Sequence, residues 1–580
     1  MPQQAQRPEA KSREGQGPEA GFCTLLAGWA QAYASFIKGL DGWKRAAIAA
    51  AAGIVSVASL APFFIWPVMF LTLPVIVWLI DAASNAPRQS RSEATQTYDF
   101  SLATRRAFSA GWWFGFGYFA AGLFWVGEAF LVEADKFAWL LPLAVTLLPA
   151  GLALFFGLGS AIAQKFWTPG PARVLTLAVT LGVTEWLRGH VLTGFPWNVL
   201  GYTLTSTDAL MQSAALFGTY SLSLWAVMIF AAPLVLLAAQ PAGSTPRAAL
   251  ARSLGVAAIP LVLAGGYGYW RFAQNTAPDV AGVNLRIVQP SIPQREKWLP
   301  EKQGEIFQLH LAMSRQGPTG EADDLKGITH LIWPEAAMPF RPLDHPEALA
   351  SISKLVGTSA YLFSGGLRVT ANQADAGLAG PHRPDAYNSL MVFGPGGGLS
   401  ALYDKIHLVP FGEYLPWQAT LEAIGLQQLT NMRGGFSSGA SPRQLIQVAG
   451  LPPATVLICY EAIFPGEVVQ SENRPGLIIN VTNDGWFGNT TGPRQHFHQS
   501  RVRAVEEGVP LIRVANNGIS AVVDSMGRTR DVLGMNVRGV IDSGLPAAQE
   551  GGTPYGRLGN LLFLLHVVIF ACAAGVLGRR

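Results

Sequence analysis

The chain has 580 residues, of which half are hydrophobic, 13% are charged and 17 are tryptophan. This composition is typical of a membrane protein and excludes an ordinary soluble domain. The formal net charge of +4 is small for this length and is not gathered into one long basic run. We therefore expect no nucleic-acid partner.

The first segment, residues 1–44, is rich in Gln, Glu, Gly and Pro and has no continuous apolar core. A cleaved signal peptide requires such a core, so we expect none here. The composition instead predicts a polar, disordered tail on the cytoplasmic side of the membrane.

Residues 45–273 are predicted to form a membrane domain, because stretches long enough, or nearly so, to cross about 30 Å of hydrocarbon recur along them. One more stretch lies within residues 557–580, which makes eight crossings in all. Pro62 and Pro67 interrupt the first long apolar stretch, so a re-entrant hairpin is the alternative there. The expected crossings lie near residues 46–61, 63–80, 107–126, 139–162, 174–187, 214–238, 256–270 and 558–577.

Basic residues predict the orientation of these crossings. Counted along eight spans, the basic clusters all fall on one face: Lys44, Arg45, Arg88, Arg91, Arg105, Arg106, Lys165, Arg173, Arg247, Arg252, Arg579 and Arg580. The positive-inside rule places both termini in the cytoplasm. By parity, residues 274–556 lie on the opposite, extracytoplasmic face of the membrane. The charged residues Glu185 and Arg188 lie near a span end, and no transporter-like repeat is found, so ion translocation is disfavoured.

The exported segment alternates short β-rich runs with polar helical stretches. Its roughly 280 residues are ample for one α/β domain with a large core. Helices expected at residues 301–315 and 494–507 would cover the sheets, which predicts a layered α/β sandwich. The expected strands lie at residues 283–288, 330–333, 361–364, 389–393, 455–458, 477–481 and 511–514.

Three chemically active side chains, Glu335, Lys405 and Cys459, come just after strand-like runs. Strand ends are where α/β folds gather catalytic groups. Acyl transfer through a thiol needs a base, a cation or N–H donors for the oxyanion, and a sharp turn that exposes the sulfur. Taken singly, these residues could be a solvated acid, a surface charge and a small buried apolar residue.

Cys459 has no cysteine with which to pair in the exported segment. The other two cysteines are Cys23 in the N-terminal tail and Cys572 in the last hydrophobic stretch. A lone thiol facing an oxidising compartment is more typical of a nucleophile than of a structural element.

In these motifs the chain resembles the apolipoprotein N-acyltransferase family, whose catalytic domain is of the nitrilase (carbon–nitrogen hydrolase) type. The resemblance covers about residues 45–577 and implies a multi-span α-helical membrane domain with an exported α-β-β-α sandwich. The motifs are TEWLRG (184–189), LTGFPW (192–197), VQPSIPQ (288–294), IWPE (332–335), HLVPFGE (407–413), ICYE (458–461), NDGWFG (483–488) and NNGIS (516–520).

Carried over by position, the resemblance implies that Cys459 is the nucleophile, Glu335 the general base and Lys405 the cation that stabilises the oxyanion. The reaction it implies is ping-pong. Cys459 takes the sn-1 acyl chain of a phospholipid such as phosphatidylethanolamine. The α-amine of the diacylglyceryl-cysteine of an apolipoprotein then attacks the thioester. The resemblance implies no cofactor and no metal, and we expect a monomer.

Four further positions match supporting residues of the family. Glu413 corresponds to its second acid, and the backbone N–H of Tyr460 to the other oxyanion donor. Tyr460 and Glu461 match positions that the family needs for activity, and Trp298 matches a mobile aromatic residue at the substrate entrance. The polar tail and the Ala-, Gly- and Pro-rich insertion at residues 371–384 depart from the family pattern.

Several histidines allow other interpretations. His496 and His498 could suggest a metal pair, but their spacing puts them on different sides of a helix and no Cys or carboxylate set is expected to complete a site. His407 could pair with Cys459 as in thiol proteases, but the Glu and Lys motifs would then have no role.

Other polar residues have a simpler structural interpretation. Asn483 and Trp486 are expected in turns and packing. Arg494, Arg501 and Arg503 are expected to pair with Glu506 or Glu507 on a solvated helix face.

Two other functions are considered from the sequence. In a membrane-tethered amidase or nitrilase-type hydrolase, water would resolve the acyl-enzyme. A scaffold or transporter that only binds lipid would leave the three active side chains unexplained.

Overall fold

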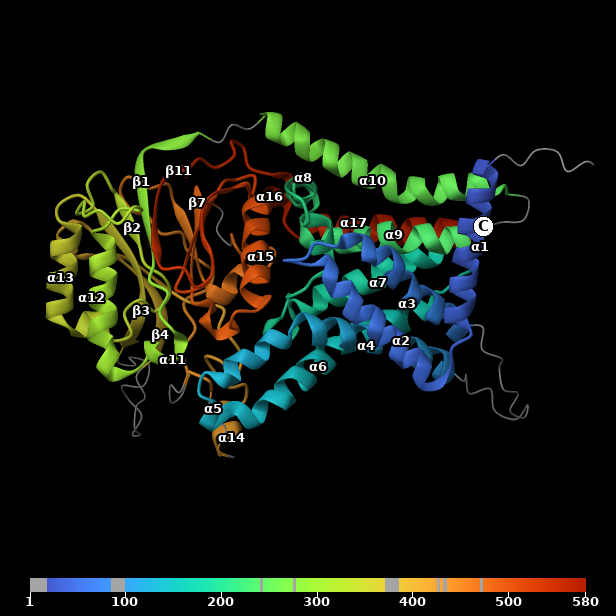
Figure 1. The fold of residues 1–580 in the computed structure, drawn as a ribbon, viewed down its shortest axis with the longest axis horizontal. Coiled ribbons are helices and arrows are strands. Elements are labelled where there is room, and N and C mark those ends of the chain that lie inside the picture. The colour runs from blue at the N-terminus through green and yellow to red at the C-terminus, as the bar shows by residue number, and fades with distance from the viewer. Residues whose placement is uncertain are drawn as a thin grey trace, which may run out of the picture.

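The computed structural model describes residues 18–579 except 85–99, 240–243, 275–277, 371–384, 424, 426–427, 431–434 and 470–472. The insertion at residues 371–384 and the first 17 residues therefore lie outside the described part. A bundle of helices occupies one end of the molecule and a layered α/β domain the other (Figure 1).

The helical bundle contains the first ten α-helices of the described residues and the last two. By length and composition, five helices of the described residues are suited to cross a membrane, or six if one bent pair is counted as a single span. Two of the eight expected crossings correspond to shorter helices, α2 with 15 residues and α7 with 17. The helices are α1 Pro18–Lys38, α2 Gly42–Ser56, α3 Met69–Ser84, α4 Phe100–Gly122, α5 Ala134–Phe137, α6 Leu141–Lys165, α7 Ala172–Arg188, α8 Asp208–Met211, α9 Ser213–Ala239, α10 Pro246–Gln274, α16 Pro554–Leu558 and α17 Leu561–Gly578.

Helix α1 corrects the prediction that the whole of residues 1–44 is a disordered tail. Ala27 and Ala30 of α1 are buried against Leu237 of α9 and Ala249 of α10. Small and apolar residues recur along α1 at helical spacing, and this narrow stripe packs on the bundle. The polar composition of the segment as a whole concealed the stripe.

The α/β domain contains two stacked sheets. One has six strands in the order β11-β1-β2-β3-β4-β5, and the other has five in the order β10-β9-β8-β7-β6. Within each sheet, three consecutive strands are parallel: β1, β2 and β3 in one, and β6, β7 and β8 in the other. The strands are β1 Asp279–Gln289, β2 His330–Ile332, β3 Tyr361–Thr370, β4 Asp385–Phe393, β5 Leu399–Asp404, β6 Ala454–Ile458, β7 Leu477–Thr482, β8 Leu511–Ala515, β9 Ser520–Val523, β10 Thr529–Leu533 and β11 Gly539–Pro546.

Helices cover both outer faces of the sheet pair, which confirms the α-β-β-α sandwich. Apolar residues from both sheets, such as Ile332 and Val481, form the core between them. On one outer face pack α12 Gln303–Ser314 and α13 Pro346–Val356, and on the other packs α15 Gly492–Glu507. The remaining short helices are α11 Gln294–Lys297 and α14 Gln418–Ala423.

Helix α15 begins and ends close to its predicted bounds, but it has no broad solvated face. It lies between the second sheet and the bundle (Figure 1). Arg503 does pair with Glu506, at 2.9 Å, yet both are fully buried. Arg503 Nη2 also donates to Thr219 Oγ1 of α9 at 2.8 Å.

The two other arginines of α15 have different partners. Arg501 pairs with Asp208 of α8 at 2.6 Å, and Arg494 donates to the Thr490 carbonyl at 2.6 Å. Among the described residues, neither arginine therefore pairs with Glu506 or Glu507 as predicted. Polar residues of α15 thus bind protein partners, several of them in the bundle.

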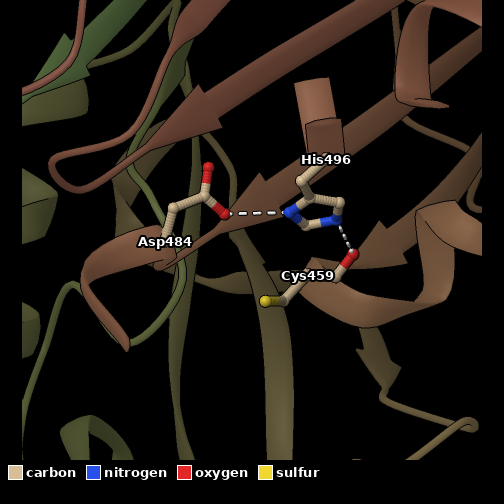
Figure 2. Close-up of side chains that lie close together, drawn as sticks. All are labelled: Cys459, Asp484 and His496. Carbon is tan, nitrogen blue, oxygen red and sulfur yellow. Dashed lines mark hydrogen bonds and ion pairs between the residues drawn. The ribbon is translucent and has the colours of Figure 1, made fainter. Parts of the chain in front are cut away.

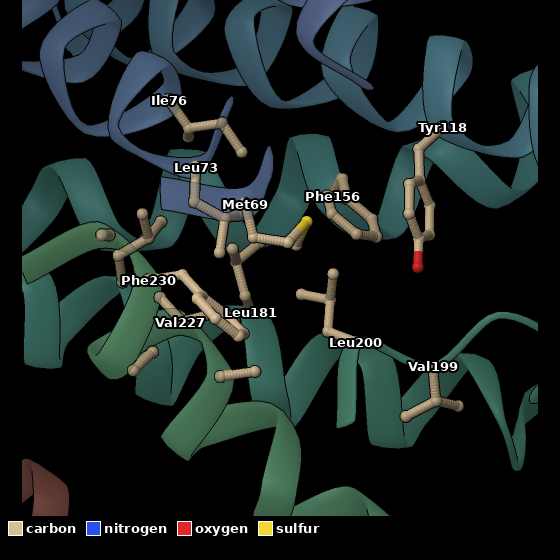
Figure 3. Packing of buried hydrophobic residues seen from close by; sticks show 14 of the residues in the cluster. Met69, Leu73, Ile76, Tyr118, Phe156, Leu181, Val199, Leu200, Val227 and Phe230 are labelled. Carbon is tan, nitrogen blue, oxygen red and sulfur yellow. The ribbon is translucent and has the colours of Figure 1, made fainter. Parts of the chain in front are cut away.

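The two halves of the chain share one apolar core. Tyr460, Phe464 and Val502 of the α/β domain pack in the same cluster as residues of the bundle. Figure 3 shows the bundle part of this cluster, in which Met69 lies near Leu181. The α/β domain is thus packed on the helices over a continuous surface.

Candidate active site

Cys459 lies at a sharp turn immediately after β6. Its φ angle is 51°, in the left-handed region that a non-glycine residue rarely adopts. Backbone strain of this kind persists where the surroundings hold it, and it is frequent at functional sites. The residue is 6% exposed and its thiol is free. The turn thus places the sulfur at the carboxyl end of β6, an edge strand of the five-stranded sheet.

Glu335, Lys405 and Glu413 form one buried charge cluster. Lys405 Nζ lies 2.9 Å from Glu413 Oε2 and 3.9 Å from Glu335 Oε1. Asn388 joins the two acids, because its Nδ2 donates to Glu335 Oε1 at 2.8 Å and to Glu413 Oε1 at 3.0 Å. Three of the sequence-predicted residues thus meet around an amide that sequence reasoning missed.

Burial sets the ionisation of this cluster. Loss of water raises the pKa of Glu335. Burial also raises the pKa of the Cys459 thiol, and the charge of Glu335 raises it further. Burial alone would lower the pKa of Lys405, but the charges of Glu413 and Glu335 outweigh it and the net pKa is raised. Lys405 therefore stays cationic, while Cys459 rests as a thiol that needs a base to attack.

Lys297 is a second buried lysine at the site, and the sequence reasoning missed it. It ends α11, is fully buried, and its Nζ donates to the Glu335 carbonyl oxygen at 2.9 Å. Burial lowers the pKa of Lys297 to about 8, although the charges of Glu335 and Cys459 oppose this. Its neighbour Trp298, which was predicted at the substrate entrance, is 44% exposed. Its position directly before Trp298, a predicted site residue, is the sequence feature that could have identified Lys297.

Glu461 ties the cysteine turn to the segment after Lys405. Its Oε2 accepts from the N–H of Ile458 at 2.7 Å, one residue before Cys459. Its Oε1 accepts from the N–H of Ile406 at 3.0 Å, one residue after Lys405. Burial alone would raise the pKa of Glu461, but Arg443 at 3.1 Å and these donors lower it. The carboxylate thus fixes the nucleophile relative to the cation.

Tyr460 follows the nucleophile and faces the membrane domain. Its hydroxyl donates to the Gly194 carbonyl at 3.1 Å, and its ring packs against Phe195 and Phe464. The side chain therefore lies in the contact between the two halves, while its backbone N–H stays next to Cys459.

The His496 ring lies between Asp484 and the backbone carbonyl of Cys459 (Figure 2). Its Nε2 lies 3.0 Å from the Cys459 carbonyl oxygen and its Nδ1 lies 2.9 Å from Asp484 Oδ1. Arg513 Nη2 donates to Asp484 Oδ2 at 2.8 Å. Possible ligand atoms of Cys459, Asp484 and His496 lie within 4.8 Å of one another. Both ring nitrogens and the carboxylate already have protein partners, so these residues fit an orienting network better than a metal site.

The two other histidines considered from the sequence, His498 and His407, contact the bundle. His498 Nε2 pairs with Thr205 Oγ1 at 2.8 Å, which agrees with the prediction that His496 and His498 point to different sides of the helix. His407 Nε2 pairs with the Thr193 carbonyl at 2.7 Å and its ring stacks on Phe464. The pairing of His407 with a thiol, as in proteases, is therefore not the arrangement found.

Two family models match the chain. Residues 52–232 match the apolipoprotein N-acyltransferase N-terminal domain, and residues 284–555 match the carbon–nitrogen hydrolase. An apolipoprotein N-acyltransferase of Rhodopseudomonas palustris is 44% identical over 520 residues, which is 90% of this chain and 92% of that protein. One of Brucella melitensis is 40% identical over 547 residues, which is 93% of this chain and 97% of that protein.

Among solved structures, a carbon–nitrogen hydrolase of Helicobacter pylori is 14% identical, with a TM-score of 0.32 over 46% of this chain and 89% of that one. The family assignment rests on the two family models and on the relatives above, which extend across both halves. The chain therefore belongs to the apolipoprotein N-acyltransferase family of membrane-bound acyltransferases.

Proposed function

We propose that this protein transfers an acyl chain from a phospholipid to the α-amine of the N-terminal diacylglyceryl-cysteine of a lipoprotein. The observation that carries the proposal is the buried cluster of Glu335, Lys405 and Glu413 beside the strained Cys459 turn. That cluster lies in a domain packed directly on apolar helices. A thiol nucleophile close to a membrane suits an acyl donor that is itself a lipid.

In the first half-reaction, the Cys459 sulfur attacks the carbonyl carbon of the sn-1 ester and Glu335 takes the thiol proton. The tetrahedral oxyanion is held by Lys405 and the backbone N–H of Tyr460. The oxyanion collapses, the C–O bond breaks, and the leaving alkoxide takes the proton from Glu335. The products are a thioester and a lysophospholipid.

In the second half-reaction, the α-amine of the lipoprotein attacks the thioester carbonyl. Glu335 accepts a proton from the amine, and Lys405 again holds the oxyanion. The C–S bond breaks and the departing Cys459 thiolate takes up that proton. The products are an amide on the lipoprotein and the restored enzyme.

Burial favours an amine over water as acceptor. Glu335 is 7% exposed, Lys405 1% and Cys459 6%. Such a site limits the access of bulk water to the thioester, whereas a lipid-anchored amine is delivered along the membrane surface. The exposed Trp298, next to the buried Lys297, is proposed to contact the acyl chains of either substrate.

The proposed setting follows from the charge pattern of the sequence. The positive-inside rule puts both termini in the cytoplasm and the α/β domain on the periplasmic face of the inner membrane. Phosphatidylethanolamine is the proposed donor and a monomer the proposed form.

The proposal is tested by mass spectrometry of the Cys459 peptide after the purified protein meets phosphatidylethanolamine, with and without neutral hydroxylamine. A chase with a diacylated lipopeptide follows. The expected result is a hydroxylamine-sensitive acyl adduct on Cys459 that moves to the peptide amine. An adduct lost only to water would favour a hydrolase, and no adduct on Cys459 would overturn the thiol mechanism.

A further inference from the structure

We propose that the buried pair Glu185–Arg188 of α7 positions the active site from within the membrane domain. The pair acts on the loop of residues 192–200, here called the α7 loop, which contacts the walls of the site. Glu185 and Arg188 are thus positioning residues, although they lie in another domain from the cysteine.

Three hydrogen bonds of the Glu185–Arg188 pair are made to the backbone of this loop. Its two side chains are 2% and 1% exposed, and the ion-pair distance of 3.4 Å is long. Arg188 Nη1 donates to the Trp197 carbonyl at 2.9 Å and also to the Phe195 carbonyl. Glu185 Oε1 accepts from the N–H of Leu200 at 2.9 Å. Burying two charges is costly, and in this pair the charges fix three backbone positions of the loop.

The α7 loop needs such restraint because its backbone is strained. Leu192, Thr193 and Asn198 have φ angles of 55°, 77° and 54°. Gly194 has a φ of 77°, and a Cβ added there would lie 2.0 Å from the Gly189 carbonyl oxygen. Positive φ at non-glycine residues persists only where neighbouring contacts hold it.

The loop touches the cysteine turn on one side. The Gly194 carbonyl accepts from the Tyr460 hydroxyl at 3.1 Å. Tyr460 follows Cys459 and carries the N–H proposed for the oxyanion. A shift of Gly194 would therefore move the residue that supplies this donor.

The loop also contacts the segment after Lys405 and the helix α15 that carries His496. The Thr193 carbonyl pairs with His407, which lies two residues after Lys405. Trp197 Nε1 donates to Gln495 Oε1 at 2.8 Å, and its ring centroid lies 5.5 Å from that of His496, which contacts the Cys459 carbonyl. The pair thus connects to the nucleophile, the cation and the orienting histidine through one short loop.

The test compares Arg188→Gln with Arg173→Gln in the full chain. Arg173 lies on the same helix and makes a comparable buried pair, with Asp81 at 3.2 Å. It therefore controls for the loss of a buried charge in the bundle. Two rates are measured per folded molecule: acylation of Cys459 by phosphatidylethanolamine, and alkylation of Cys459 by iodoacetamide across pH, both read on the Cys459 peptide.

Arg188→Gln is expected to slow acylation at least tenfold and to displace the pH profile of alkylation, while Arg173→Gln leaves both unchanged. The acylation measurement rests on the proposed function, whereas the alkylation measurement does not. A failure of the proposed function is therefore distinguishable from a failure of the positioning role. Equal behaviour of the two variants would overturn the positioning role.

A variant that keeps the charge protects the test against misfolding. Arg188→Lys retains a cation but cannot donate to both loop carbonyls. Tyr460→Phe removes only the hydroxyl that reaches Gly194. Both are expected to change alkylation in the same direction as Arg188→Gln, by a smaller amount. Wild-type profiles in both would refute the link.

Discussion

Replacing Glu461 by Gln is expected to weaken the α/β domain and to disable acyl transfer together. The carboxylate accepts from the backbone N–H of Ile406, His407 and Ile458 and pairs with Arg443. An amide has nearly the same shape, but its NH₂ group can only donate. Whichever way it is turned, it faces at least one backbone N–H that then has no acceptor.

The magnitude follows from these contacts. If the amide nitrogen replaces Oε2, the Ile458 N–H is left buried without an acceptor, which costs about 1–3 kcal/mol. Arg443 also loses its buried counter-charge, and breaking such a pair costs about 3–5 kcal/mol. The two losses share one side chain and are not additive. We expect about 3–5 kcal/mol in all, and a fall of the melting temperature on the order of 10 °C.

Two measurements are made. Thermal unfolding in detergent is monitored by tryptophan fluorescence, and acylation of Cys459 is measured in a single turnover. Glu347→Gln is the matched control, because this side chain of α13 is exposed and pairs only weakly at the surface with His345, and it should change neither. Adding Arg443→Met to Glu461→Gln should restore part of the stability, because the buried guanidinium that paired with Glu461 is then removed. It should not restore acylation, because the backbone donors still lack their acceptor. A Glu461→Gln protein with normal melting and normal acylation would refute the reasoning.

Three further predictions concern the charge cluster and its support. Glu335→Gln should slow thioester formation about 10²–10⁴-fold with unchanged melting, as measured by mass spectrometry of the Cys459 peptide; acylation at the wild-type rate would exclude Glu335 as the base. Gly365→Ala should lower acylation and stability, because the added Cβ would lie 2.6 Å from the Glu335 Cα, whereas Gly366→Ala has room and serves as control. Lys297, with its pKa of about 8 against 10.5 for a free lysine, binds fewer protons in the folded than in the unfolded chain between these values. Stability should therefore rise with pH in this window, by at most about 1.4 kcal/mol per pH unit, and Lys297→Met should abolish that rise in melting measurements at pH 8 and 10.

The strand-end residues could be predicted because the signal is local. Glu335 follows β2 after two residues, Lys405 follows β5 directly and Cys459 follows β6 directly. In each case a short apolar run marks the strand and a polar residue marks its end. The three strands are not neighbours, since β2 and β5 are separated by β3 and β4 and β6 belongs to the other sheet. The sequence therefore predicts each strand end, whereas the meeting of the three ends depends on how the two sheets stack.

Asn388 and Lys297 could not be predicted in the same way. Asn388 lies inside β4, where an amide looks like any outward polar residue of a strand. Its role depends on Glu335 and Glu413, which are 53 and 25 residues away along the chain. Lys297 depends on a carbonyl 38 residues away. Partners at such separations leave no periodic trace in the sequence.

The position of α15 was misjudged for a different reason. A helix rich in Arg, Glu and His predicts a solvated face when water is the assumed neighbour. In this fold the neighbour is the polar loop-and-helix surface of the bundle, where Arg503 binds Thr219 and Glu506 accepts from the same residue. Composition indicates that a helix face is polar, but it does not indicate whether water or another part of the protein forms its hydrogen bonds.

This polar contact bears on how the reaction stays at the membrane. Buried charged hydrogen bonds tolerate little displacement, because breaking one leaves an uncompensated charge. The Arg503–Glu506 pair bound to Thr219, together with Tyr460 bound to Gly194, therefore fixes the α/β domain in one orientation on the helices. A flexible tether would let the thiol move freely relative to the helices, whereas these contacts hold Cys459 at one position on the helical bundle. For the phospholipid donor proposed above, these contacts would keep the thiol where a lipid can reach it.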